Sequence, residues 1–273
     1  MSLDRSLPKL ATKMVAAESD TARTKLLRQE VPRLYRHLKR VRIERGLLSR
    51  WGMSVNLDEL AGVEIVSPDT LRVIGQCADI TMQPPAYHAG LQHTYGYLLS
   101  LVETPYGYKR DRWLSDRIEV GFGLPRHSLN AFPRRGTLLG NLTDFLVRLS
   151  LREGPPAKSV GAVAEFDKQS LERTPGTRIV EEIRGDDRDT ILLRTDLFPM
   201  PYTPGEGLLV YSIKKSRSGW KLVTTFPIEQ PSWDELLSPS RFGNEQPIKV
   251  RYNGFVNNFP ADGVLGKRTK TDL

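Results

Sequence analysis

A histidine, several tyrosines and a run of cations lie close together in the middle of this sequence, and these residue types can do chemistry. Strand-forming residues around a central turn predict a long β-hairpin over 91–122. That hairpin would bring Lys109, Arg110 and Arg112 back across from His93. An imidazole can move protons on a phosphodiester while guanidinium groups hold the developing charge. The alternative for His93 is a half-buried histidine that is hydrogen-bonded to a neighbouring carbonyl.

The tyrosines of the same stretch suggest a binding role. Five of the nine tyrosines lie between positions 87 and 108, where they alternate with glycine. Tyrosine rings stack on single-stranded or flipped-out bases, and adjacent cations bind phosphates. The alternative is a hairpin that uses tyrosine because this residue suits half-buried strands. The candidate base-stacking residues are Tyr95, Tyr97, Tyr106 and Tyr108.

A second hairpin, near the C-terminal end, offers another set of polar side chains. The alternating segments 208–214 and 220–227 flank a turn that contains Gly219. A ribonuclease-type site that needs no metal could form here. Lys214 and either Thr224 or Thr225 would hold the phosphate, and a histidine from elsewhere, such as His93, would move the protons. The same alternation is typical of any amphipathic hairpin, which is the alternative interpretation.

The positive charge of the chain is concentrated at its N-terminal end. The net charge is +8, and residues 1–50 hold thirteen Lys or Arg against five Asp or Glu. In residues 51–273 the 27 basic and 27 acidic residues balance. Any long-range attraction to a polyanion must therefore come from the first fifty residues or from local clusters.

A helix with one apolar stripe carries most of these cations. The stripe has spacings of three and four residues, and Pro32 within it predicts that a new helix begins there or that one helix kinks. The exposed side can neutralise phosphates of a nucleic acid. It can also merely face solvent or bind another acidic partner, but it is too short and too poor in aromatic residues to favour a membrane. The stripe consists of Leu27, Val31, Leu34, Leu38 and Val41, and the candidate phosphate-binding cations are Arg33, Arg36, Lys39 and Arg40.

Several classes of enzyme lack their signatures here. The sequence has no Gly-rich phosphate loop, no dinucleotide-binding fingerprint and none of the common hydrolase, metalloprotease or kinase motifs. His88 and His93 are five apart, which suits neither one helix face nor one strand face, so we expect no metal site and no cofactor. A single cysteine, Cys77, allows no disulfide within the chain and favours a reducing, cytoplasmic setting.

Apolar periodicity and turn residues predict the elements that must position these side chains. Thr137 is a natural N-cap for a helix over 137–152. We expect this helix to pack across a mixed or antiparallel sheet of about eight strands. Beside the two hairpins, the expected strands are 71–74, 78–82, 160–166, 179–183 and 190–197.

The sequence therefore predicts an α+β protein with a basic helical segment, residues 1–52, and a body, residues 53–273, which has a sub-boundary near 154–158. The leading functional hypothesis is a metal-independent enzyme that cleaves phosphodiester or base–sugar bonds in nucleic acid. One alternative is a nucleic-acid-binding protein without catalysis, and another is a cytoplasmic small-molecule enzyme. The apolar stripe at 27–41 also offers a surface for a homodimer.

Overall fold

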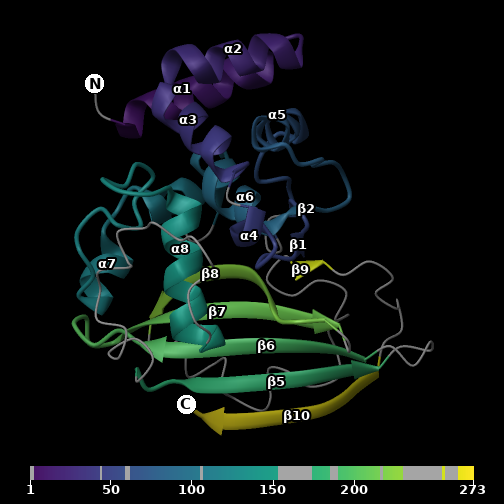
Figure 1. Cartoon of the computed structure of the whole chain (residues 1–273), viewed down its shortest axis with the longest axis vertical. Coiled ribbons are helices and arrows are strands. Elements are labelled where there is room, and N and C mark those ends of the chain that lie inside the picture. Colours follow the sequence, from purple (N-terminus) through teal and green to yellow (C-terminus); the bar gives the residue numbers. More distant parts are fainter. Residues whose placement is uncertain are drawn as a thin grey trace.

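The computed structural model describes residues 3–43, 45–58, 62–104, 107–152, 174–184, 190–215, 218–229, 254–255 and 264–273. Helices fill the upper part of Figure 1, and a five-stranded antiparallel sheet forms its lower part. The protein is therefore an α+β fold, as the sequence predicts.

Helices make up most of the described chain up to residue 151. The α-helices are α1 (Leu3–Ala16), α2 (Asp20–Glu30), α3 (Pro32–Val41), α4 (Arg45–Leu48), α5 (Pro68–Ala78), α6 (Ala89–Leu91), α7 (Arg117–Phe122) and α8 (Leu138–Leu146). Two π-helical segments, η1 (Gln92–Gly96) and η3 (Val147–Leu151), continue α6 and α8, and η2 (Lys109–Trp113) is a 3-10 helix.

The predicted break at Pro32 is confirmed. Ser19 caps α2 by accepting a hydrogen bond from the Ala22 amide at 3.2 Å, and Pro32 occupies the first turn of α3, where its missing N–H is not needed. The apolar stripe is at most 6% exposed and packs against α5, α8 and the other N-terminal helices. Because other parts of this chain cover the stripe, the stripe is not available as the homodimer surface that the sequence suggested.

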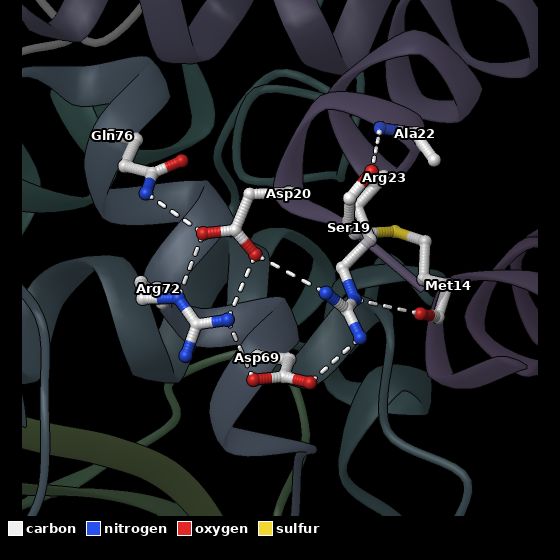
Figure 2. Close-up of polar contacts among 8 residues, drawn as sticks. All are labelled: Met14, Ser19, Asp20, Ala22, Arg23, Asp69, Arg72 and Gln76. Atoms are coloured by element: carbon white, nitrogen blue, oxygen red, sulfur yellow. Dashed lines mark hydrogen bonds and ion pairs between the residues drawn. The ribbon is translucent and has the colours of Figure 1, made fainter. Parts of the chain in front are cut away.

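The two short strands expected at 71–74 and 78–82 are wrong, because α5 covers most of this region. Ser67, Pro68 and Asp69 stand at the N-cap and first turn of α5, where proline and an acid stabilise a helix start. A network of charges then fixes α5 to α2 (Figure 2). Within it, Asp20 accepts hydrogen bonds from Arg72 at 2.8 Å and from Gln76 at 2.9 Å.

The long hairpin expected over 91–122 is also wrong. This stretch forms α6, η1, η2 and α7, and only β3 (Glu103–Thr104) pairs with β4 (Gly107–Tyr108) as a short hairpin. Leu91, Tyr95 and Leu98 share one helical face and are fully buried. Burial on every side outweighs the strand propensity of the tyrosines, because that propensity measures how well a residue fits a half-buried sheet.

The helix expected over 137–152 is confirmed as α8 with η3. The hydroxyl of Thr137 accepts a hydrogen bond from the Gly140 amide at 3.0 Å, as an N-cap should. In Figure 1, α8 runs from the helical layer down onto the face of the sheet. The helix is buried along its whole length, so it forms the centre of the core.

Among the described residues the main sheet has five strands, in the order β10-β5-β6-β7-β8 with antiparallel neighbours throughout, where about eight strands were expected. The C-terminal hairpin and the strands around 179–183 and 190–197 are confirmed, whereas the strand expected at 160–166 lies outside the described residues, as does the sub-boundary near 154–158. The strands are β5 (Thr177–Arg184), β6 (Thr190–Pro199), β7 (Glu206–Lys215), β8 (Lys221–Glu229) and β10 (Val264–Asp272), and a small sheet joins β1 (Met53–Ser54) to β2 (Tyr87–His88) and β9 (Gly254–Phe255).

A buried ionic network holds η3 on the sheet. Asp196 on β6 is fully buried and accepts two hydrogen bonds from Arg178 of β5, at 2.8 and 2.9 Å, and one from the Ser150 hydroxyl at 2.7 Å. Arg194 lies 3.4 Å from the same carboxylate and donates to Ser150 at 3.2 Å. The charge of Asp196 is thus fully compensated, as burial requires.

Candidate nucleic-acid interface

The exposed side of α3 is entirely basic. Its exposed residues are Pro32 and four cations, and the helix contains no acidic residue. At about 100° per residue, the four cations span an arc of about 120° centred opposite the buried stripe. The apolar stripe therefore fixes the direction in which the positive charge points. The four cations are Arg33, Arg36, Lys39 and Arg40, all of which the sequence predicted as phosphate-binding residues.

Arg33 joins this helix to the loop between α7 and α8. Its Nη2 atom donates to the carbonyl oxygens of Phe132 and Pro133, at 3.3 and 3.5 Å, and its guanidinium lies 5.3 Å from the centre of the Phe132 ring. Arg134 and Arg135 follow directly in the chain and are both exposed. The loop therefore extends the basic surface beyond α3. We call Arg33, Arg36, Lys39, Arg40, Arg134 and Arg135 the α3 basic face.

His37 responds to this concentration of charge. His37 is a half-buried residue of α3, and its ring lies 6.0 Å from that of Phe132 and 6.5 Å from that of Tyr95. Burial lowers its pKa, the positive charges of Arg33, Arg40 and Arg36 act in the same direction, and together they bring it to about 4. The imidazole is therefore neutral near pH 7, and the surrounding arginines supply the positive potential.

Acidic residues of the neighbouring helices are already occupied by other cations. Glu30 forms an ion pair with Lys13 at 2.6 Å, and Asp20 is held by Arg72 and Arg23 (Figure 2). Within the described ranges Arg36 forms no ion pair. Arg36 thus keeps its charge for an external anion.

The second predicted set of cations, at 109–112, is engaged within the protein. Lys109 forms an ion pair with Asp58 at 3.3 Å. Arg110 donates to the Ser100 carbonyl at 2.9 Å and stacks on the Tyr108 ring at 3.8 Å. Arg112 donates to the Thr225 carbonyl at 2.8 Å, and its guanidinium lies within 6 Å of three ring centres, those of Tyr97, Trp113 and Phe226. These contacts connect η2 to the Ser100 region and to β8.

The predicted base-stacking tyrosines do not form a stacking surface. Tyr95 and Tyr97 are 0% and 3% exposed, and one face of Tyr108 is covered by Arg110. Tyr106 lies outside the described residues. A ring buried in the core cannot receive a base in this conformation.

His93 is buried in the core on η1. Its Nε2 atom lies 2.9 Å from the Ser54 hydroxyl, and its ring lies 4.9 Å from that of Tyr97. Burial lowers its pKa to about 3, and the positive charge of Arg112 acts in the same direction. His93 and Arg112 both contact the Tyr97 ring, so the two residues are near each other through helical packing and not across a hairpin. A neutral, covered imidazole is poorly placed to exchange protons with a substrate.

Lys214 and Thr224 do not converge with His93 on one site. Thr224 pairs with Tyr211 on β7, and Lys214 is three positions further along that strand. Because side chains alternate along a strand, Lys214 points to the opposite side of the sheet from Tyr211. The combination of these three residues as one catalytic set is therefore wrong.

Sequence reasoning missed the contribution of Arg134 and Arg135. The signal was a pair of arginines between Pro133 and Gly136, which is typical of an exposed turn. Their position beside α3 depends on a contact across about 100 residues of chain, which no local pattern encodes.

Two other kinds of site are absent from the described residues. Within these ranges no group of three or more His, Cys, Asp or Glu side chains is arranged to hold a metal ion. No helix in the same part of the chain combines the length and apolar character needed to span a bilayer. Comparison of the chain with protein-family models, curated proteins and solved structures gave no match.

Proposed function

We propose that this protein binds nucleic acid through the α3 basic face. The observation that carries the proposal is the exposed arc of Arg33, Arg36, Lys39 and Arg40 opposite the buried stripe of the same helix. Guanidinium and ammonium groups bind phosphate oxygens by charge-assisted hydrogen bonds, and each neutralised phosphate releases counterions. Arg134 and Arg135 add two further cations at the side of the helix.

Burial of the apolar side of α3 favours a nucleic acid over a lipid surface. A helix that lies on a membrane inserts its apolar face among the acyl chains. In α3 that face consists of Leu34, Leu38 and Val41, all 0% exposed and packed in the core. Such a helix can offer a partner its charges but not its apolar stripe.

Binding without catalysis is the form of the hypothesis that the geometry supports better. The candidate acid–base residue, His93, is 2% exposed, and Lys214 lies on the opposite side of the sheet from Thr224, so the three residues do not form one catalytic set. Cleavage of a phosphodiester or base–sugar bond would need a proton-transfer group that can reach the substrate. The α3 basic face itself contains only arginine and lysine, which hold phosphates but stay protonated near neutral pH.

The test is a binding titration of the full chain against a labelled nucleic acid. Arg36→Gln/Arg40→Gln removes two exposed charges from α3, and we expect a loss of at least about tenfold in affinity at about 150 mM salt. Lys270→Gln is the matched control, because Lys270 is exposed on β10 at the other end of the molecule (Figure 1). An equal loss in both variants, or binding to acidic lipid vesicles but to no nucleic acid, would overturn the proposal.

A further inference from the structure

We infer that the nucleic acid held by the α3 basic face is double-stranded and is gripped by its phosphates without reading of its bases. This inference rests on the proposed function and names the class of partner. It differs from the expectation based on the sequence, in which the tyrosines suggested binding of a single strand or a flipped-out base.

In the described part of the chain, the cations of α3 have no open aromatic surface beside them. Proteins that hold single strands stack successive bases on aromatic rings. The aromatic rings nearest α3 are covered: Phe132 is 7% exposed beneath Arg33, Tyr95 is fully buried, and partly buried Tyr35 packs against the core with Lys39 over its ring at 5.7 Å. Among the described residues, a splayed base would therefore find no fully open ring beside α3.

The exposed side chains of α3 are also of types that bind phosphates better than they distinguish bases. Sequence reading in a groove uses mainly Arg and Lys with guanine and Asn or Gln with adenine. The exposed residues of α3 include no amide or hydroxyl side chain. Arg33 is further committed to the carbonyl oxygens of Phe132 and Pro133, which restricts the directions in which it can reach. The helix therefore lacks the side chains that read adenine and has one arginine held away from guanine, whereas all four cations can bind phosphate oxygens.

The backbone of α3 is held rigidly in the protein. The buried stripe fixes α3 in the core, and Arg33 ties it to the α7–α8 loop. Arg33 and Arg40 are seven residues apart, which places their Cα atoms about 10 Å apart along the axis. A duplex also presents its phosphates at fixed positions, on both sides of a groove about 12 Å wide, whereas a single strand must be ordered on binding. A helix whose backbone is already fixed loses least entropy when its ligand is rigid as well.

The experiment compares a DNA duplex of about 20 base pairs with its labelled strand alone, by fluorescence anisotropy on the full chain at about 150 mM salt. We expect the duplex to bind at least about tenfold more tightly, and an RNA duplex of equal length to bind within about fivefold of the DNA. A second duplex of shuffled sequence should bind within about threefold of the first.

The possible failures are distinguishable. If Arg36→Gln/Arg40→Gln weakens binding but the single strand binds as tightly as the duplex, the duplex inference is overturned and the proposed function stands. If the shuffled duplex binds more than about tenfold differently, the surface reads bases and the inference is again overturned. If no nucleic acid binds, or if the double variant binds like the parent, the proposed function itself fails.

Discussion

Arg23 and Asp69 meet at 2.6 Å across the interface between α2 and α5 (Figure 2). Arg23 is one of the basic residues that make the N-terminal segment positive, yet its side chain is only 7% exposed. It also donates to the Met14 carbonyl at 3.0 Å and to Asp20 at 3.2 Å. This arginine therefore connects α1, α2 and α5, and it contributes nothing to the α3 basic face.

Removing Arg23 should destabilise the fold. Arg23→Met leaves the Met14 carbonyl without this donor and weakens the pairing of both aspartates, so we expect a loss of about 2–3 kcal/mol in the free energy of unfolding. The matched control is Lys13→Met, which breaks an ion pair of the same 2.6 Å length with Glu30. Lys13 is 56% exposed, and its loss should cost less than about 1 kcal/mol. Urea unfolding checks both values, and similar costs for the two variants would refute the structural role of Arg23.

The salt dependence of binding should count the phosphate contacts of the α3 basic face. For a duplex, the slope of log K against log salt is about −0.9 per neutralised phosphate. Arg36→Gln/Arg40→Gln should therefore make the slope shallower by about 1.8, and Lys270→Gln should leave it unchanged. Titrations at several salt concentrations give the slopes. A double variant that weakens binding with an unaltered slope would mean that these arginines do not contact phosphates.

Glu119 should make stability fall as the pH rises through the neutral range. It is 1% exposed on α7 and accepts a hydrogen bond from the Leu129 amide at 2.8 Å. Burial raises its pKa to about 7 from an ordinary 4.5, so between these values the folded protein keeps a proton that the unfolded chain has lost. The stability present at low pH is therefore lost as the pH rises toward about 7.

Glu119→Gln keeps an acceptor for the Leu129 amide and removes the charge. We expect this variant to exceed the parent by up to ~3 kcal/mol in unfolding free energy at about pH 8 and to equal it near pH 4.5. Glu18→Gln, at an exposed position, should change neither value. A parent and a Glu119→Gln variant with parallel pH profiles would contradict a protonated Glu119.

His93 should change the stability with pH in the opposite direction to Glu119. Burial lowers its pKa to about 3 from an ordinary 6.5. Between these two pH values the histidine is protonated in the unfolded chain but neutral in the folded protein. The contribution of the neutral histidine to the free energy of unfolding is complete above pH 6.5 and is lost as the pH falls. Between about pH 7 and pH 5 we expect the parent to lose about 2 kcal/mol more than His93→Gln does. Denaturant titrations at the two pH values check this, and equal losses would show that His93 titrates normally.

Asp196 should be the least replaceable member of the network that joins η3 to the sheet. Asp196→Ala leaves Arg178 and Arg194 without their shared carboxylate, and we expect a cost of about 3–5 kcal/mol. Ser150→Ala removes only one hydroxyl from the same network and should cost about 1–2 kcal/mol. The ratio of the two costs is the readout from thermal or urea unfolding. A larger cost for Ser150→Ala would mean that the helix, and not the ion pairing, dominates this interface.

Local signals predicted the parts of the fold that local chemistry determines. Pro32 and Thr137 sit at helix starts as their capping roles require, and the hairpin of β7 and β8 follows from alternation around a glycine turn. The region around His93 was misread because tyrosine and threonine there favour strands on average. Complete burial between α5 and β8 imposes helix instead, and that information lies in the packing partners.

The candidate site was predictable to the extent that it depends on charge and helical periodicity. Counting charges located the basic segment, and the stripe at 27–41 implied which side of α3 would be exposed. The buried state of Arg23 and the contact of Arg33 with the Phe132 carbonyl were not predictable, because each depends on residues far away in the chain.

The place of β10 at the edge of the sheet sets an order of events during synthesis. β5 leaves the ribosome about 80 residues before β10, a delay of roughly 4–16 s at ordinary translation rates. Until β10 arrives, the outer backbone groups of β5 have no strand to bond with, and an open strand edge can pair with another chain. The nascent protein is therefore most exposed to mispairing in this interval, at the sheet and not at the helices already made.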